Sequence, residues 1–176
     1  MSYFHISHLY FVQNIRSIKN GSRKELVKAV ELSDKLLRAT INKDESTVAE
    51  IIGEAHQANT SPKFYNNEQA LRSVVIMAYL SSVDDYIRFE ELASGKGYID
   101  LLFLPALQSS KPALIIELKW NKSAEKAIQQ EQDQQYWKFA KQFRYKGKIL
   151  LVGINYNSKT KKHTCKIKEI ESLEKN

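Results

Sequence analysis

Leu114-Ile115-Ile116-Glu117-Leu118-Lys119-Trp120 is the stretch of sequence that decides the fold. Its apolar density predicts a central strand of a β-sheet, spanning 113–120, and two charged residues interrupt it. Because side chains alternate along a strand, Glu117 and Lys119 are expected on one face and Leu118 on the other. A charge in a mostly buried strand is costly unless it is paired or binds a metal, so both charges need an explanation.

Asp100 is another charged residue in an apolar strand, one strand earlier in the sequence, and its charge also needs a partner. It lies in an apolar segment that is predicted as a strand over 98–104, and a turn at 109–112 leads from this segment to the strand of Glu117. Two hairpin-related strands could place the two carboxylates side by side. Converging carboxylates make an oxygen site that suits Mg²⁺ or Mn²⁺. Lys119 next to such a site could orient a water molecule or stabilise charge during phosphodiester hydrolysis.

A second interpretation of these residues needs no chemistry. A Glu-x-Lys tripeptide on a strand is more often a solvated ion pair on an outward face, and a lone Asp is a weak signal. The apolar density around Glu117 and the hairpin-like interval to Asp100 favour the functional interpretation. The pattern alone leaves both open.

Helices are predicted for the first part of the chain. Capping-box spacings at 22–25 and 47–50 indicate two helix starts. A third helix is expected from about 67 to 80, with Glu68 in its first turn, where the helix dipole favours a carboxylate. The apolar residues at helical spacing are Leu26, Val30, Leu36 and Leu37 in the first helix, and Val48, Ile51, Ile52 and Ala55 in the second.

Strands are predicted for the second part, over 86–91, 98–104, 113–120, 149–154 and 164–170, with one long helix over 123–142. The order is helices followed by β-β-β-α-β-β. A strand-helix-strand passage predicts a parallel pair with a right-handed crossover, whereas hairpins are antiparallel. The fold class is therefore α/β (α+β), with a mixed central β-sheet flanked by helices. We assign 1–60 to an N-terminal helical extension and 61–176 to the domain that carries the site.

Amino-acid composition limits the class of protein to which this chain can belong and the kind of partner it can bind. The 176 residues are 43% apolar and 27% charged, which suits one globular domain and argues against disorder. A single cysteine, Cys165, excludes an internal disulfide and suits a cytoplasmic location, and no apolar run is long enough to predict a membrane span. The formal charge of +7 favours an acidic partner such as nucleic acid. Residues 111–148 carry nine Lys or Arg against four acids, so positive charge gathers near the candidate site.

The combined motifs resemble those of the PD-(D/E)XK nuclease superfamily, in which a helical Glu precedes a strand Asp and a (D/E)-x-K tripeptide on the next strand. The resemblance is narrower to the nuclease-like domain at the C-terminus of a bacterial family of AAA-ATPase-like proteins. It covers residues 60–170 well. The segments that carry it are Gly95-Lys96-Gly97-Tyr98-Ile99-Asp100, the run from Pro112 through Glu117-Leu118-Lys119 to Ala124, and Leu151-Val152-Gly153-Ile154-Asn155-Tyr156.

The resemblance implies a restriction-endonuclease-like core and a division of roles among the site residues. Asp100 and Glu117 would bind Mg²⁺ or Mn²⁺, the backbone carbonyl of Leu118 would add a metal contact, and Lys119 would be the catalytic lysine. Glu68 matches the helical acid. Relatives carry a Gln and a Tyr on the helix after the lysine, and a structural role for the Tyr is an equal alternative. The candidate nucleic-acid contacts are Gln130, Tyr136, Lys122 and Lys126.

Two departures from the family pattern bear on function. Ile99 stands where the superfamily name has Pro, and no G-x-x-x-x-G-K-S/T phosphate loop occurs, so an ATPase portion is not expected in this chain. The leading hypothesis is a metal-dependent nuclease acting on DNA, with RNA less favoured. The alternatives are a catalytically idle nucleic-acid-binding or regulatory module of a partner ATPase, and a homo-oligomeric interaction domain that uses the N-terminal helices.

Overall fold

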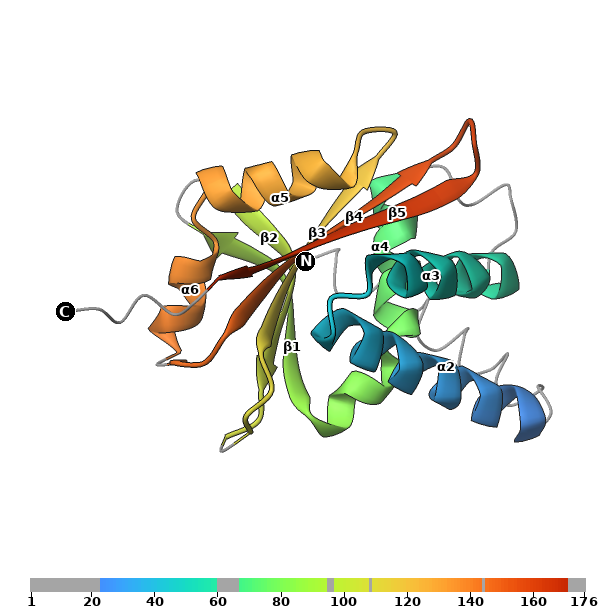
Figure 1. Cartoon of the computed structure of the whole chain (residues 1–176), viewed down its shortest axis with the longest axis horizontal. Helices are drawn as coiled ribbons and strands as arrows, with labels where there is room; N and C mark the ends of the chain where they lie inside the picture. The colour runs from blue at the N-terminus through green and yellow to red at the C-terminus, as the bar shows by residue number, and fades with distance from the viewer. Residues whose placement is uncertain (1–22, 60–66, 95–96, 108, 144, 171–176) are drawn as a thin grey trace, which may run out of the picture.

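The computed structural model describes residues 23–59, 67–94, 97–107, 109–143 and 145–170. Within these residues three helices come first, followed by a short 3-10 helix, three strands, two further helices and two strands (Figure 1). The helices are α2 (Arg23–Ile41), α3 (Glu45–Asn59), α4 (Glu68–Ala78), η1 (Leu80–Asp84), α5 (Ala124–Asp133) and α6 (Trp137–Gln142). The strands are β1 (Tyr86–Ser94), β2 (Gly97–Pro105), β3 (Ala113–Trp120), β4 (Ile149–Asn157) and β5 (Lys162–Ile170).

One mixed sheet organises the molecule, with the spatial order β1-β2-β3-β4-β5. β3 and β4 are parallel, and the other three neighbouring pairs are antiparallel. The parallel pair is joined through α5 and α6, as a strand-helix-strand crossover requires. The predicted fold class is confirmed: the structure is α/β, with a mixed central sheet flanked by helices.

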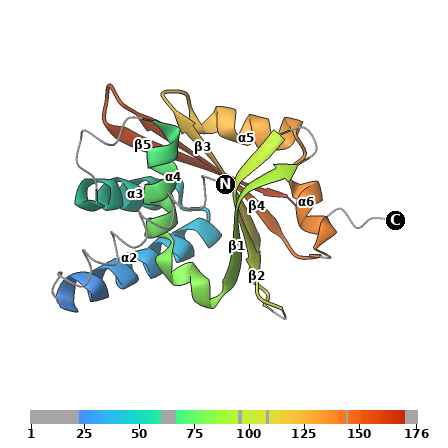
Figure 2. The same cartoon turned by 180° about the vertical axis from the view of Figure 1, so that it is seen from behind.

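Helices cover both faces of the sheet, and β3 supplies a side-chain layer to each (Figures 1 and 2). Leu114, Ile116 and Leu118 belong to the core cluster under α2, α3 and α4. Ala113 and Ile115 belong to the cluster on the opposite face, which includes residues of α5 and α6. Because the side-chain period is two, Glu117 and Lys119 point to the same face as Ile115.

Helices α2 and α3 pack into the same core as the sheet. Leu36 of α2 and Ile52 of α3 share a buried cluster with Leu101 and Val152, and α3 lies against β5. The division of the chain at residue 60 stays a prediction. Among the described residues, no helix is long and apolar enough to cross a membrane.

Three local predictions for the N-terminal helices have different outcomes. The second capping box is wrong, because α3 begins at Glu45 and the carboxylate of Asp44 accepts the Thr47 N–H at 3.1 Å. Val30 is 40% exposed and does not belong to the buried face, whereas Leu36 and Leu37 do. The first capping box begins at Ser22, outside the described residues.

The predicted helix over 123–142 is wrong in one respect, because it breaks into α5 and α6. Gln135 has a φ of 55° at the break, in the left-handed region that ends a helix. The break turns Tyr136 into the core, where it is fully buried. The third predicted helix is likewise shorter, since α4 ends at Ala78 and η1 follows.

The crossover helix approaches the sheet closely at Gly153 of β4. A Cβ atom there would lie 2.4 Å from the carbonyl oxygen of Ala124 and 2.8 Å from the Cβ of Ala127. Only glycine permits this separation. The close approach holds α5 over the strands that carry the candidate site.

Candidate active site

Asp100 and Glu117 meet where the β2–β3 ladder opens. The paired residues of these strands end at Leu101 and Ile116, so the two acids occupy the next positions. The Asp100 carboxylate enters the opening, and its Oδ2 accepts the Leu118 N–H at 2.8 Å. Tertiary structure thus brings the two predicted carboxylates to one end of the sheet.

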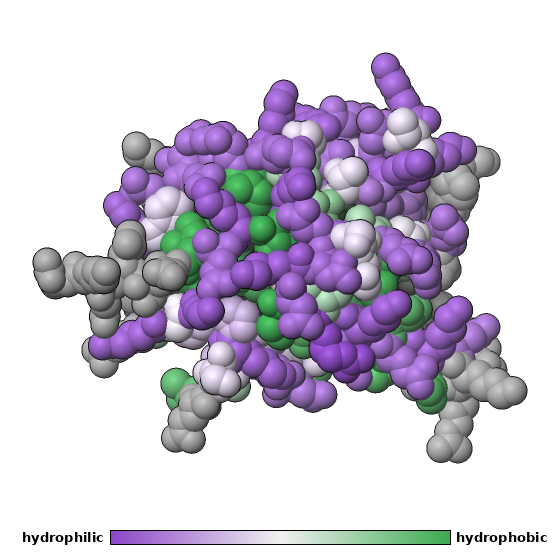
Figure 3. All heavy atoms as spheres, viewed as in Figure 1, coloured by the Kyte–Doolittle hydropathy of each residue, from purple (hydrophilic) through white to green (hydrophobic). Residues whose placement is uncertain are grey.

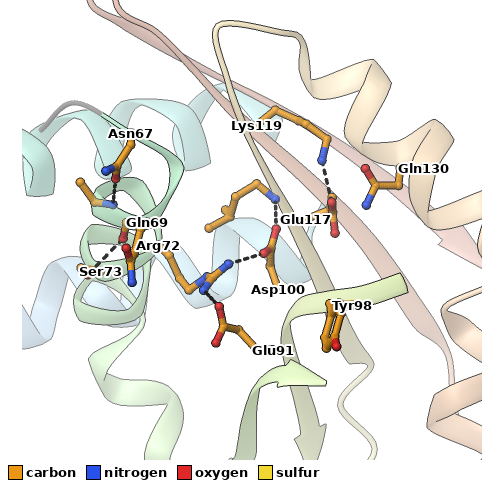
Figure 4. A network of polar contacts seen from close by, with 12 residues as sticks. Asn67, Gln69, Arg72, Ser73, Glu91, Tyr98, Asp100, Glu117, Lys119 and Gln130 are labelled. Atoms are coloured by element: carbon orange, nitrogen blue, oxygen red, sulfur yellow. Dashed lines mark hydrogen bonds and ion pairs between the residues drawn. The ribbon is translucent and has the colours of Figure 1, made fainter. Parts of the chain in front are cut away.

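Glu117 and Lys119 form a buried ion pair. The Lys119 Nζ lies 2.6 Å from the Glu117 Oε1, and the residues are 6% and 3% exposed (Figure 4). Alternation along β3 places them on one face, as predicted. The alternative of a solvated pair on an outward face is wrong, because both side chains are buried and α5 packs against β3 and β4.

Burial makes Glu117 an unusual carboxyl group. It raises the pKa of Glu117 to about 7, the neighbouring Asp100 charge adds to the rise, and the Lys119 hydrogen bond opposes it. The Oε2 of Glu117 is buried and has no hydrogen-bond partner among the described residues. An oxygen in that state is available to a cation.

Arg72 of α4 also reaches the site, and our sequence interpretation missed it. Its Nη2 lies 2.7 Å from Asp100 Oδ1, and its Nη1 contacts the Glu91 carboxylate (Figure 4). A signal was present, because Arg72 follows Glu68 by four residues and therefore shares its helix face. An arginine on a face predicted to meet two acids was a candidate partner for them.

Glu68 lies at the predicted place but does not join the other acids as a ligand group. It is the first residue of α4, after the N-cap Asn67, whose side chain accepts the Ala70 N–H at 2.9 Å. Its charge contributes to the raised pKa of Glu117, behind the effects of burial and Asp100. Among the described residues, no three His, Cys, Asp or Glu side chains are arranged to hold a metal.

Gln130 and Tyr136 form a hydrogen-bonded link from the crossover helix to β2. The Gln130 side-chain amide donates to the Tyr136 hydroxyl at 3.1 Å, and that hydroxyl donates to the Tyr98 carbonyl at 2.9 Å. Tyr136 is fully buried, so its contacts agree with the structural role. Gln130 is half-buried, and in Figure 4 its side chain extends from α5 on the side of β3 that carries Glu117 and Lys119.

Glu131 is a buried acid near the site that the sequence interpretation left unassigned. It is fully buried on the α5 face formed by Ala124 and Ala127, and neither of its oxygens makes a hydrogen bond of good geometry among the described residues. Burial raises its pKa well above the usual value, the charge of Glu117 adds to the rise, and the backbone of Val152 opposes it. The spacing of Ala124, Ala127 and Glu131 on one helical face was the available signal.

Lys122 and Lys126 flank the start of α5 and are exposed. The Lys122 N–H donates to the Asn155 side chain at 3.0 Å, which ties the turn after β3 to β4. Ser123 caps α5 by accepting the Lys126 N–H. Lys122 is therefore carried by the turn after β3 and Lys126 by the first turn of α5.

The residues at the β2–β3 opening fit a hard divalent cation. Asp100 and Glu117 supply carboxylate oxygens, one of which is buried and makes no hydrogen bond within the described part of the chain. Such oxygens are the donors that Mg²⁺ and Mn²⁺ prefer. The neighbouring Leu118 carbonyl belongs to the same strand. Two carboxylates leave most positions of an octahedral ion to water and substrate, as is usual for Mg²⁺.

Comparison with known proteins agrees with this geometry. The sequence model of the PD-(D/E)XK nuclease superfamily matches residues 66–166, which include every candidate site residue. No curated protein matches the chain.

Proposed function

Because this chain belongs to the PD-(D/E)XK nuclease superfamily, we propose that it is a Mg²⁺- or Mn²⁺-dependent nuclease that hydrolyses phosphodiester bonds of DNA. The observation that carries the proposal is the buried set of Asp100, Glu117 and Lys119 at the opening of the sheet. RNA is the less favoured substrate.

The proposed roles follow from the positions of the side chains. Asp100, Glu117 and the carbonyl of Leu118 would hold the metal ion, which would supply polarisation of the phosphoryl oxygen and a lower pKa for a bound water. Lys119 orients the attacking water and stabilises the negative charge that develops on phosphate. Glu117 holds the Lys119 ammonium in place through the 2.6 Å contact. Glu68 supplies negative charge from the edge of the site.

The lysines at the same end of the sheet support nucleic acid as the substrate. The turn after β3 and the β4–β5 hairpin lie together, because Asn121 accepts hydrogen bonds from the Ser158 N–H and hydroxyl at 2.7 and 2.9 Å. In the described part of the chain, the lysines of these two loops are exposed and make no ion pair. The surface there is mainly hydrophilic (Figure 3). We define the lysine surface as Lys122, Lys126, Lys159, Lys161 and Lys162.

A catalytically idle binding or regulatory module is the second candidate function. The observation that favours it is that Arg72 and Lys119 already neutralise the two candidate ligand carboxylates. In this version the lysine surface holds nucleic acid without cleavage, and an AAA-ATPase-like protein is the proposed partner. Salt-sensitive binding of nucleic acid without metal-stimulated hydrolysis would identify it.

We also propose a cytoplasmic location and a homo-oligomeric state for the protein. The single Cys165 is buried and free, which is compatible with the reducing cytoplasm. Val27 and Val30 of α2 are exposed apolar residues, and they support a homo-oligomer through the N-terminal helices. A monomer by light scattering at high protein concentration would remove the oligomer from the proposal.

Calorimetry and cleavage assays on the same samples test the function. Mg²⁺ and Mn²⁺ are titrated into the wild-type protein, Glu117→Ala and the control Glu125→Gln, and each is incubated with plasmid, single-stranded DNA and RNA. Glu125 is a suitable control because it is an exposed acid on α5. Joint loss of metal binding and cleavage in Glu117→Ala alone supports the nuclease. Metal binding without cleavage by the wild-type protein supports the idle module, and no metal binding contradicts the metal centre.

A further inference from the structure

Arg72 places a guanidinium group inside the candidate site from outside the sheet. It lies one helical turn after Glu68 on α4, and its side chain is 16% exposed. Figure 4 shows the side chain leaving α4 and ending between Asp100 and Glu91. The group is therefore held by two acids on neighbouring strands.

Both oxygens of Asp100 are occupied in this arrangement. Oδ2 accepts the backbone N–H of Leu118 at 2.8 Å, and Oδ1 accepts Arg72 Nη2 at 2.7 Å. The Leu118 N–H belongs to the backbone of β3, and it would lose this acceptor if the Asp100 side chain turned away. Oδ1 is the oxygen that movement of the Arg72 side chain alone can release.

A divalent cation and the guanidinium compete for the same carboxylate. Two positive charges about 4 Å apart repel strongly where water is partly excluded. Asp100 is 8% exposed, so solvent screens this repulsion only weakly. Occupation of the Asp100 carboxylate by a metal ion therefore favours departure of Arg72.

Glu91 gives Arg72 a second anchor outside the metal position. It lies in β1 between the paired residues Glu90 and Leu92, opposite Asp100, and this position is missing from the β1–β2 pairing. Its φ of 50° turns the backbone out of the ladder, and its side chain is 53% exposed. The guanidinium can thus leave Asp100 and keep the Glu91 ion pair. The Arg72 Nε has no partner among the described residues, so it loses no hydrogen bond in the move.

We propose that Arg72 competes with the metal ion for Asp100. In the metal-free protein Arg72 binds the Asp100 carboxylate, and when a divalent cation binds, Arg72 releases Asp100 and keeps its ion pair with Glu91. This inference rests on the proposed function, because it takes Asp100 as a metal ligand. Arg72 is a positioning residue in this scheme: it keeps the carboxylate ordered and its charge compensated until the metal arrives.

Calorimetric titration of Mn²⁺ tests the competition without any measurement of cleavage. The proteins are the wild type, Arg72→Met, Arg72→Lys and the control Arg88→Met. Arg88 pairs with Glu90 at 3.2 Å on β1 and is a matched arginine outside the site. Removal of Arg72 is expected to tighten Mn²⁺ binding roughly tenfold, within the range typical of coupled ligands. Arg72→Lys keeps the charge, so its Mn²⁺ affinity should lie between those of the wild type and Arg72→Met. Arg88→Met should bind Mn²⁺ like the wild type.

Equal or weaker Mn²⁺ binding by folded Arg72→Met would overturn the competition while leaving the metal centre in place. No Mn²⁺ binding by any of the proteins would overturn the metal centre and the competition together. Circular dichroism and thermal melting report whether each variant is folded.

The unmutated protein offers a second measurement if Arg72→Met does not fold. In ¹⁵N spectra of arginine side chains, the Arg72 Nε signal is identified by its loss in Arg72→Lys. The signal should shift as Mg²⁺ is added and saturate together with the calorimetric binding curve. A stationary Arg72 signal at saturating Mg²⁺ would overturn the proposal.

Discussion

The carboxylate of Asp100 accepts the backbone N–H of Leu118 at 2.8 Å, immediately beyond the last paired residues of β2 and β3. This contact anchors a candidate metal ligand on one strand to the residue between Glu117 and Lys119 on the next. It fixes Asp100 against the (D/E)-x-K tripeptide without a covalent link or a loop. A change at Asp100 therefore tests architecture and chemistry separately.

Asp100→Asn is expected to abolish metal-dependent cleavage while keeping the fold. The amide oxygen can still accept the Leu118 N–H, but the charge that favours a divalent cation is lost. We expect cleavage to fall by at least about 100-fold, as for the loss of a main electrostatic contributor in an active site. Cleavage rates and urea unfolding measure the two effects. Asp133→Asn, an exposed change on α5, is the control and should leave both unaltered.

Lys119→Met should separate cleavage from metal binding. The methionine fills the space of the lysine stem but supplies no charge to the water or the phosphate, so cleavage should fall by roughly 100-fold. Asp100 and Glu117 remain, so Mn²⁺ should still bind by calorimetry. Unchanged cleavage would refute the assigned role of Lys119. Lys138→Met on α6 is the control for loss of a positive charge, because Lys138 is exposed.

Metal affinity should rise with pH around neutrality. Burial raises the pKa of Glu117 to about 7, so near that pH part of the population carries a proton that a metal ion must displace. Affinity for Mn²⁺ should therefore increase with pH, because Glu117 loses its proton and becomes a charged carboxylate. Mn²⁺ should bind more tightly at about pH 8 than at about pH 6. Calorimetry in buffers of different ionisation enthalpy measures the released proton. The same affinity and no proton release across this range would contradict the expectation.

Glu131→Leu should stabilise the protein, and more so at high pH. The folded-state pKa of Glu131 is raised, so the folded protein holds this proton more firmly than the unfolded chain, and wild-type stability is lost as pH rises toward that folded value. Replacing an unpartnered buried carboxyl by an apolar side chain is expected to add about 1 kcal/mol or more to the free energy of unfolding. Urea unfolding at about pH 5 and about pH 8 measures the difference.

The surface acid Glu125 provides the comparison for Glu131. Glu125→Leu changes the same residue type on the same helix at an exposed position. It should alter stability little and equally at both pH values. A gain in Glu131→Leu that is independent of pH would show that Glu131 is not held protonated by burial.

Replacement of the three hairpin lysines, Lys159, Lys161 and Lys162, by glutamine should weaken nucleic-acid binding and its salt dependence. Each phosphate contact contributes about 0.9 to the slope of log affinity against log salt for duplex DNA. If all three lysines contact phosphate, the slope should become shallower by up to about three times that contribution. Fluorescence anisotropy over a salt series measures it.

Lysines far from the hairpin serve as the control for that slope. Lys28 and Lys35 are exposed on α2, on the other side of the sheet from α5. Their replacement by glutamine lowers the net charge without touching the lysine surface. An equal loss of slope in this control would assign the effect to overall charge rather than to the hairpin.

Local patterns sufficed for much of the fold. The apolar run around Glu117 predicted β3 with its observed ends, and the turns at 95–97 and 109–112 predicted the antiparallel neighbours of β2. The single helix over 123–142 was wrong because helical spacing does not reveal a break that buries one tyrosine. The start of α3 was wrong because two residues at capping distance, Asp44 and Thr47, compete, and the Asp44 carboxylate is the one that caps the helix.

The sequence by itself determined that Glu117 and Lys119 share a face, because alternation along a strand is a property of the backbone. It also selected Asp100 as their partner, because an acid in an apolar strand requires compensation. Only the tertiary structure decided which cationic side chains compensate these acids and how deeply the acidic and basic side chains are buried. Arg72 reaches Asp100 from 28 residues away in sequence. Glu131 is buried on α5, across the sheet from α4, and the charge of Glu117 acts on it. Such contacts arise from the packing of helices on the sheet, and pKa values depend on that packing through desolvation and distance.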